Sequence, residues 1–385
     1  MVFLFCFIIW IHVPYYETRW LLKGNKYWIV KIIKEIKNPY FRSSSKFKKR
    51  RKKMKRVILL LIAVALVIFV LMSWGKKSDK PIELKFAHYS VETHPAHLAA
   101  VMFANGVEQR TKGKIKITIF PNSKLGNSQE ILEQVRLGAV DFAMPTEPAM
   151  AKYVPKFNLV GAPFAFKDYA QTDKFFNNDF IKWVSSDMES KGFEYIARWE
   201  WGFRNYTNSR HPILTPDDVK GLKMRTPPDF VNSATVNALG GIAQTIAFSE
   251  LPMALKQGVV DGQENPIGVI YSFKMYETQK YLSVINYTYN GTHLVMGKAM
   301  YDKLSKDQQK IIKEEGAKAG VYMMKAVRDQ ENKQIEELKK LGMVVDMPDT
   351  APFKAAAQSV WGELKAKVTD AEYNEFVKLV DKSSK

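Results

Sequence analysis

Cysteine is almost missing from this sequence of 385 residues. Its one cysteine is Cys6, and no thiol follows it. Disulfide frameworks, thiolate zinc sites and cysteine nucleophiles are therefore excluded for the rest of the chain. A body without cysteine suits an oxidising compartment, but such bodies also occur elsewhere.

Motifs for cofactors and common catalytic machinery are also missing. The sequence has no glycine-rich dinucleotide loop, no phosphate loop, no HExxH zinc motif and no GxSxG nucleophile elbow. His88, His94 and His97 lie close together in the chain, but their spacing matches no metal site. We therefore expect neither a cofactor nor a metal, and His88 is kept as a candidate pocket histidine at the end of a strand.

Acidic residues are scarce only near the N-terminus. Residues 1–80 hold 19 Lys and Arg residues and 3 acidic residues, whereas residues 81–385 hold 39 basic and 36 acidic residues. The formal net charge of +19 thus belongs mainly to the N-terminal segment. The main body gives no electrostatic reason to bind nucleic acid.

The N-terminal segment has the pattern of an export signal. A basic run at 46–56 precedes sixteen uninterrupted apolar residues at 57–72. Such a pattern is typical of a secretory signal peptide, and the uncharged stretch is also about long enough to span a bilayer. We interpret residues 54–75 as a signal peptide or membrane anchor, and residues 1–53 as an upstream extension outside the working protein. The alternative for this extension is a second membrane segment near its start.

From Pro81 on, strand-like and helix-like patterns alternate. Residues 83–90 and 114–120 alternate apolar and polar side chains, whereas 97–111 and 128–138 have helical spacing. This order predicts an α/β fold with mainly parallel strands. Towards the C-terminus, residues 306–342 form one long helical pattern that could bridge two lobes, and residues 351–380 suggest two further helices.

One pattern occurs twice, about 120 residues apart. EQVRLGAVDFAMP and MALKQGVVDGQENP each combine a helix, a glycine stop, a Val-Asp step and a polar turn. The repeat suggests two lobes of similar construction. Because ligands of open α/β sheets bind at the carboxyl ends of strands, we expect the polar turns at 145–147 and 263–265 to face a cleft between the lobes.

Two arginines are the strongest candidates for binding an anion. Arg225 directly follows a short strand and precedes two prolines, and Arg204 lies among aromatic residues. A guanidinium group in such a position can hold a carboxylate through two parallel hydrogen bonds. The alternative for each arginine is a salt bridge at the surface or between the lobes.

Asp261, Glu264 and Asn265 occupy the second polar turn. Paired carboxylates can perform general acid–base chemistry, so an exported hydrolase using Asp261 and Glu264 is one alternative. No nucleophile or metal cluster accompanies them, and Asp261 is well suited to cap the turn. Asn265 could contact a ligand from this corner, or the turn could be purely structural.

Six motifs in a fixed order resemble one protein family. FPNSKLGN, EQVRLGAVDF, GFRNYTNS, GLKMRTP, AFSELPMALKQGVVDGQENP and YETQKYL closely resemble the DctP-type solute receptors of tripartite ATP-independent periplasmic (TRAP) transporters. The resemblance implies a two-lobed α/β periplasmic binding protein fold with a hinge and a long helix spanning both lobes. We assign residues 81–201 and 291–330 to lobe I, and residues 202–290 and 331–385 to lobe II.

The resemblance also implies a site for a small organic acid. Arg225 matches the arginine that clamps the ligand carboxylate, Arg204 matches a second site arginine, Asn265 matches the site asparagine, and Phe248 matches an aromatic residue beside the ligand. Weaker matches fall at Tyr89, Ser128 and Thr146. Trp201 or Phe248 would form an apolar floor, and Thr146, Ser128 or Glu147 would bind hydroxyl groups.

The same resemblance implies the class of ligand and the partners. The weaker positions depart from the sialic-acid receptors, which favours an aldonate, a uronate or another hydroxylated monocarboxylate. C4-dicarboxylates stay open, because a second carboxylate could use Arg204, and so do 2-oxo acids. A receptor of this kind is not an enzyme. It would be a monomer in the periplasm or on the outer face of the cytoplasmic membrane, and would deliver its ligand to the small and large permease subunits.

Overall fold

The computed structural model describes residues 59–64, 66, 80–177 and 179–385, and the chain divides into two compact units, 1–79 and 80–385. The described residues of the first unit are helical. The predicted extension 1–53 and most of the predicted signal or anchor lie outside the described residues. Within the described ranges, no helix is long and apolar enough to cross a membrane.

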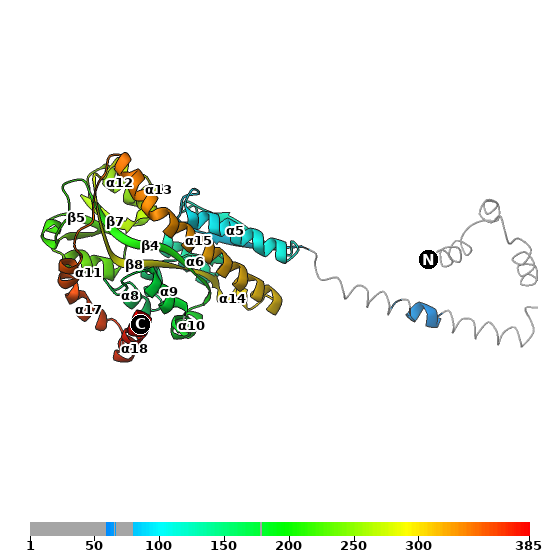
Figure 1. The fold of residues 1–385 in the computed structure, drawn as a ribbon. Helices are drawn as coiled ribbons and strands as arrows, with labels where there is room; N and C mark the ends of the chain where they lie inside the picture. Colours follow the sequence, from blue (N-terminus) through cyan, green and yellow to red (C-terminus); the bar gives the residue numbers. More distant parts are fainter. Residues whose placement is uncertain (1–58, 65, 67–79, 178) are drawn as a thin grey trace, which may run out of the picture. The chain divides into compact units, whose positions relative to one another are not determined.

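The second unit is built on one nine-stranded sheet with helices packed around it (Figure 1). The order is β2-β1-β3-β8-β4-β7-β5-β6, with β9 (Val344–Asp346) beside β8. One outer group of parallel strands contains β1 (Ile82–Ala87), β2 (Ile115–Phe120) and β3 (Phe142–Ala143). The other contains β5 (Lys223–Thr226), β6 (Ile242–Thr245) and β7 (Gly262–Pro266).

Two long antiparallel strands join the outer groups. They are β4 (Phe193–Asn208) and β8 (Tyr281–Gly297), and β8 pairs with β3 while β4 pairs with β7. Irregularities interrupt their pairing between Tyr195 and Ala197, Glu200 and Gly202, and Arg204 and Tyr206. Bulges of this kind bend strands and re-aim side chains. The sheet is therefore mixed, and the prediction of mainly parallel strands holds for the outer groups but missed this pair.

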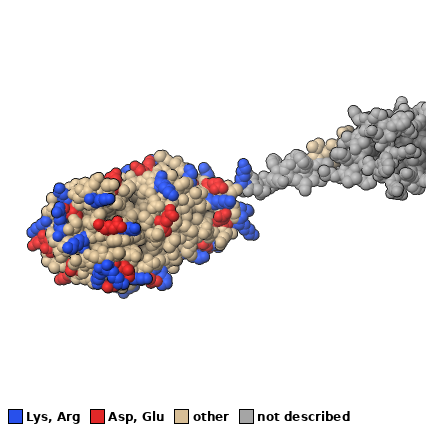
Figure 2. Space-filling model, turned by 90° about the horizontal axis from the view of Figure 1, so that it is seen from above, with Lys and Arg blue, Asp and Glu red and all other residues tan. Residues whose placement is uncertain are grey.

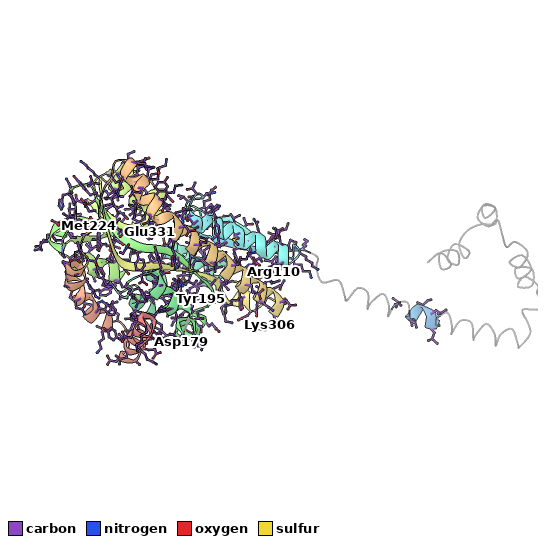
Figure 3. All side chains as sticks on the ribbon, in the orientation of Figure 1. Arg110, Asp179, Tyr195, Met224, Lys306 and Glu331 are labelled. Carbon is purple, nitrogen blue, oxygen red and sulfur yellow. The ribbon has the colours of Figure 1, made fainter. Side chains whose placement is uncertain are left out.

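The long C-terminal helix, α15 (Lys306–Lys340), packs along β4, α5 (Pro95–Arg110) and α13 (Ile267–Ser272). In Figure 3 it runs from Lys306, near Arg110 and Tyr195, to Glu331, on the side of Met224 in β5. Gly316 and Gly320 permit this close packing. A Cβ at Gly316 would lie 2.7 Å from Ile196 Cγ2, and one at Gly320 would lie 2.9 Å from Trp199 Cδ1.

The remaining helices cover the sheet and its connections. Two of them, α6 and α12, are the helices of the two copies of the predicted repeat. The C-terminal residues form three helices instead of the predicted two, and the last of them packs on α8 and α9. The bounds are α6 (Ser128–Leu137), α7 (Glu147–Ala151), α8 (Lys156–Val160), α9 (Tyr169–Asn177), α10 (Phe180–Ser190), α11 (Phe230–Ala238), α12 (Leu251–Lys256), α14 (Lys298–Tyr301), α16 (Ala351–Ala356), α17 (Gln358–Lys365) and α18 (Asp370–Ser384), with short 3₁₀ turns at Pro216–Val219, Phe248–Glu250 and Met275–Glu277.

The predicted polar turn at 263–265 is wrong. Residues Gly262–Pro266 are strand β7, buried throughout between β4 and β5. The polar residues misled the prediction, because a buried strand is normally apolar. Here their hydrogen-bonding groups are satisfied by side chains of neighbouring strands. Gly262 fits because a Cβ would lie 2.8 Å from Met224 Sδ and still closer to the Thr207 carbonyl oxygen.

The surface of the second unit mixes charges of both signs. On the face seen in Figure 2, basic and acidic side chains lie interspersed, with uncharged areas between them. This distribution agrees with the near balance of 39 basic and 36 acidic residues at 81–385. The visible face has no single-sign field of the kind that nucleic-acid binding requires.

Candidate functional site

A cavity of about 120 Å³ opens where the two outer strand groups meet the long strands. At about 30 Å³ for each water, it has room for roughly four waters or one small organic molecule. Its lining residues are spread along the sequence from Tyr89 to Asn290. They are Tyr89, Asn127, Ser128, Gln129, Thr146, Pro148, Ala149, Trp201, Arg204, Arg225, Pro227, Pro228, Ala247, Phe248, Asn265, Val269, Phe273 and Asn290.

Eight of the ten predicted site residues lie in this lining. They are Arg225, Arg204, Asn265, Phe248, Thr146, Tyr89, Ser128 and Trp201. The other two, His88 and Glu147, are buried but outside the lining. Arg204 and Arg225 are the charged members of the lining, and their surroundings differ sharply.

Arg225 has an incompletely paired guanidinium group. It lies on β5 and is 1% exposed. Its Nε donates to the Ile246 carbonyl oxygen at 2.8 Å, and Nη1 has no hydrogen-bond partner among the described residues. The pKa of Arg225 is lowered to about 10, mainly by burial; the charge of Glu264 opposes this shift and the charge of Arg204 adds to it. A buried cation without a counter-ion is costly, so this position favours an anionic ligand.

Arg204 is already paired within the protein. Its Nη2 donates to Glu264 Oε1 at 2.9 Å and to the Glu264 carbonyl oxygen at 2.6 Å. Its Nε pairs with Glu264 Oε2, and Nη1 donates to Asn290 Oδ1. Burial lowers the pKa of Arg204, but the charge and hydrogen bonds of Glu264 outweigh burial and raise it above its usual range. Arg204 therefore offers the cavity little free hydrogen-bonding capacity.

Strand β7 distributes its polar residues to both faces of the sheet. Because side chains alternate along a strand, Gln263 and Asn265 point to one face and Glu264 to the other. Asn265 Nδ2 donates to Gln263 Oε1, and Gln263 Nε2 donates to Thr207 Oγ1 at 2.8 Å. This network holds Asn265 in place at the cavity wall.

Aromatic rings form an apolar wall. Tyr89 stacks on Trp201 with ring centroids 5.2 Å apart, and its edge meets Phe248 at 5.6 Å. Phe248 packs against Phe273 at 4.7 Å, and the Arg225 guanidinium lies 5.7 Å from the Phe248 ring centre. The wall excludes water from one side of the guanidinium group, which strengthens any ionic contact made there.

The start of α6 forms a polar part of the cavity wall. Asn127 caps this helix, and the Ser128 hydroxyl has no hydrogen-bond partner. Gln129 Nε2 reaches across to the Pro228 carbonyl oxygen at 3.2 Å. Pro228 follows β5, so this hydrogen bond joins the two outer parts of the molecule at the cavity.

The predicted residues outside the lining have other partners. His88 Nε2 is 3.2 Å from His97 Nδ1, and burial lowers the pKa of His88 to about 3. Glu147 lines a neighbouring cavity of about 10 Å³, and its Oε2 accepts a hydrogen bond from Asn290 Nδ2 at 3.3 Å. Asp261 accepts from the Lys223 backbone N–H at 2.9 Å and pairs with Arg210 at 2.7 Å.

The sequence analysis missed several lining residues. Asn127 and Gln129 could have been found, because an asparagine followed three residues later by Glu130 is a capping signal that fixes this helix start. Asn290 and Phe273 had no such signal in the sequence. Among the described residues, no cluster of three His, Cys, Asp or Glu side chains could hold a metal ion.

Comparisons with known proteins identify the relatives of this chain. Residues 86–367 match the family model described as bacterial extracellular solute-binding protein, family 7. The chain is 35% identical over 281 residues to the 2,3-diketo-L-gulonate-binding periplasmic protein YiaO of Escherichia coli (strain K12), covering 73% of this chain and 86% of the relative. It is 33% identical over 295 residues to the C4-dicarboxylate-binding periplasmic protein DctP of Rhodobacter capsulatus, covering 76% and 86%.

A solved structure shows the same fold. The TRAP periplasmic solute-binding protein of Polaromonas sp. JS666, bound to D-erythronate, is 33% identical to this chain with a TM-score of 0.74. The match covers 77% of this chain and 98% of that protein. The fold is therefore that of the two-lobed TRAP solute-binding proteins.

Proposed function

Because this chain belongs to the bacterial extracellular solute-binding proteins of family 7, we propose that it captures a small organic acid through the guanidinium group of Arg225. The chain is a solute-binding receptor of the TRAP type. Within that class, a sugar acid such as an aldonate or a uronate is the favoured ligand.

The incomplete pairing of Arg225 is the observation that supports this proposal. Its buried guanidinium has one hydrogen bond to the protein among the described residues, and it lines the cavity. A ligand carboxylate placed there would gain charge-assisted hydrogen bonds in a site shielded from water. The same carboxylate would relieve the cost of burying the cation.

The rest of the lining suits a hydroxylated ligand. The lining combines hydroxyl and amide groups with the aromatic rings of Tyr89, Trp201 and Phe248; the polar members are Asn127, Ser128, Thr146, Asn265 and Asn290. Sugar hydroxyls can both donate to and accept from such groups, and the aromatic wall can cover the apolar face of a carbon chain. YiaO and the Polaromonas protein, which bind hydroxylated acids by name, are among the similar proteins.

We propose that binding closes the two lobes over the acid. The ligand would favour a closed form, in which groups such as Gln129 and Pro228 meet across the cavity, over an open form. Permease subunits in the membrane would recognise the closed form. Export to the periplasm, or display on the outer face of the cytoplasmic membrane, follows from the same role, as the names of the relatives suggest.

Two alternatives use the same cavity or its neighbours differently. A C4-dicarboxylate or a 2-oxo acid could replace the sugar acid, and the DctP relative binds C4-dicarboxylates by name. An exported hydrolase would need Asp261 and Glu264 as an acid–base pair. These carboxylates instead form ion pairs with Arg210 and Arg204, and Asp261 lies outside the lining.

A thermal-shift screen tests the proposal. The purified protein is heated with aldonates, uronates, C4-dicarboxylates, 2-oxo acids and sialic acid, because a ligand that binds the native state raises the melting temperature. We expect a rise of roughly 2–8 °C with a hydroxylated monocarboxylate. The rise should disappear in Arg225→Met and persist in Arg210→Met, which alters an exposed arginine. An equal rise in Arg225→Met would contradict the proposal.

A further inference from the structure

The two arginines of the cavity differ in the negative charge that surrounds them. Arg225 has a side-chain hydrogen bond to one backbone carbonyl group. Arg204 is held by the carboxylate of Glu264 and, through Asn290, is linked to the carboxylate of Glu147. One guanidinium group is thus flanked by two carboxylates at one end of the cavity.

Both carboxylates are sealed from solvent. Glu264 is 0% exposed and Glu147 is 1% exposed. Tyr287 adds a hydrogen bond of 2.6 Å to Glu264, whereas Glu147 Oε1 has no hydrogen-bond partner and lies 3.5 Å from His293 Nε2. Buried charges are poorly screened, so their repulsion reaches a ligand several ångströms away.

The field of Glu147 extends to the main cavity even though its side chain is outside the lining. The small cavity that it lines shares Pro148, Arg204 and Asn290 with the main cavity. The charge of Glu147 also acts on the pKa of Tyr89, which is part of the main lining. Burial raises the pKa of Tyr89, Glu147 raises it further, and Arg204 and Arg225 lower it.

We infer that Glu264 and Glu147 make the cavity selective for acids with one carboxylate and a neutral far end. A ligand carboxylate at Arg225 would leave its other end near Arg204, whose charge Glu264 already balances. A second ligand carboxylate there would find few free donors on Arg204, because Glu264 occupies them, and it would be repelled by the buried charge of Glu147. A terminal hydroxyl group would instead use the neutral groups of the lining, such as Asn290 and Thr146.

This inference rests on the proposed function and makes Glu264 and Glu147 specificity-determining residues. Glu264 acts by occupying the donors of Arg204, and Glu147 acts by its charge alone. The earlier expectation that a second carboxylate could use Arg204 loses its support, because at least four donor contacts of that guanidinium are made within the protein.

Matched acids test the inference. Each aldonate has an aldarate that differs only by a carboxylate in place of the terminal CH₂OH group, as in erythronate and meso-tartrate, gluconate and glucarate, and galactonate and galactarate. Calorimetry at neutral pH gives the affinity for both members of each pair. For the best-bound pair, we expect the unmodified protein to bind the aldarate at least roughly tenfold more weakly than the aldonate.

Two charge-removing variants locate the cause. In Glu147→Gln and in Glu264→Gln, the aldarate should gain about tenfold relative to the aldonate, because one buried negative charge is gone. Glu147→Gln does not alter the main lining, so it still tests the charge if Glu264→Gln fails to fold. Glu331→Gln is the control. Glu331 lies on α15 outside the lining and accepts a hydrogen bond from the Tyr169 hydroxyl, so this variant should leave the ratio of the two affinities unchanged.

The outcomes separate the inference from the function on which it rests. Binding of an aldarate as tightly as its aldonate overturns the inference but leaves an acid receptor in place. The inference is also overturned if Glu147→Gln leaves the ratio of aldarate to aldonate affinity unchanged, or if Glu331→Gln changes that ratio as much as Glu147→Gln does. If no carboxylate in the panel binds, the proposed function itself fails, and the inference falls with it.

Discussion

The two copies of the repeated unit share a backbone frame but differ in their chemistry. In the first copy α6 leads to β3, and in the second α12 leads to β7. Each helix is followed by a glycine with positive φ, Gly138 at 77° and Gly258 at 68°. Asp141 Oδ2 then accepts from the Lys85 N–H at 2.7 Å, and Asp261 Oδ2 accepts from the Lys223 N–H at 2.9 Å.

The difference begins one residue after these aspartates. The first copy continues with apolar Phe142 and Ala143, whereas the second continues with Gly262-Gln263-Glu264-Asn265 in a buried strand. The strands beside them also differ, because only the second group contains a charged residue, Arg225, in the cavity lining. The comparison teaches that segments at both copies contribute to the wall of the cavity, and that the proposed binding charge, Arg225, lies on a strand that pairs with the second copy.

The largest expected effect comes from removing that charge. Arg225→Met should weaken binding of the preferred acid by roughly 1,000-fold, because a buried hydrogen-bonded charge pair contributes about 2–5 kcal/mol. Arg210→Met, at an exposed ion pair, should change the affinity by less than about twofold. Calorimetric titration measures both. Comparable affinities in the two variants would place the binding charge elsewhere.

The next effect tests why the second copy carries a glycine where the first carries Phe142. Gly262→Ala should lower the free energy of unfolding by about 3 kcal/mol or more, because its Cβ would overlap the Thr207 carbonyl oxygen and Met224. Gly362→Ala in helix α17 has free space and should raise it by about 0.5–1 kcal/mol. Urea unfolding measures both. If Gly262→Ala left the free energy of unfolding unchanged, β4 and β7 would have to move apart at little cost.

The paired aspartates give a smaller effect that depends on pH. For Asp261, burial raises the pKa, but hydrogen bonds from Lys223 and Arg210 outweigh it, so the pKa is lowered. For Asp141, burial raises the pKa and the Lys85 hydrogen bond offsets this only in part. Asp261→Asn should thus cost about 1 kcal/mol at neutral pH, and Asp141→Asn less.

The sign of the pH dependence follows from these directions. A lowered folded-state pKa gives Asp261 a stabilising contribution above the unfolded-state pKa, and this contribution is lost as the pH falls through the folded-state value. The cost of Asp261→Asn in urea unfolding should therefore shrink below about pH 4. Asp141 has a raised pKa in the folded state, so its ionisation destabilises the folded protein. The loss of unfolding free energy in Asp141→Asn should therefore not shrink in acid. If the effects of Asp261→Asn and Asp141→Asn on stability depended on pH in the same way, the proposed difference between the two aspartates would be wrong.

The smallest effect concerns the contact between the two sides of the cavity. Gln129→Ala removes the hydrogen bond to the Pro228 carbonyl oxygen and should speed ligand dissociation by about two- to fivefold. Stopped-flow fluorescence of Trp201 and the other tryptophans can follow it. Ser249→Ala, at the matching position of the second copy and outside the lining, serves as the control. Equal dissociation rates in both variants would show that this contact does not hold the closed form.

Local signals predicted the elements well. The long helix expected at 306–342 is α15, and the helix expected at 128–138 is α6 with its glycine stop. These patterns could be read because helix periodicity and capping depend on residues a few positions apart. The repeat, whose copies lie about 120 residues apart, was also correctly described as a helix, a glycine and a Val-Asp step. Ser128 and Phe248 lie at matching positions before the two copies, and both line the cavity.

Pairing across long distances could not be read in the same way. Gly262–Pro266 looked like a turn because its polar residues suggest solvent, and only β4 and β5 on either side make it a buried strand. The resemblance named Arg225 as the clamping arginine and Arg204 as a second site arginine, but it gave no sign that Arg204 is already paired within the protein. Their difference depends on Glu264, which is 60 positions from Arg204 in the chain.

The sequence by itself thus determined the family, the main helices, the repeated unit and eight of the eighteen residues of the cavity wall, because short motifs and local periodicity encode them. The tertiary structure decided which arginine has free donors, that Glu147 lies behind the wall, and that Gln129 meets Pro228 across it. Hydrogen bonds and charge between distant segments set these properties, and their energies depend on burial and on distances that no single stretch of sequence contains.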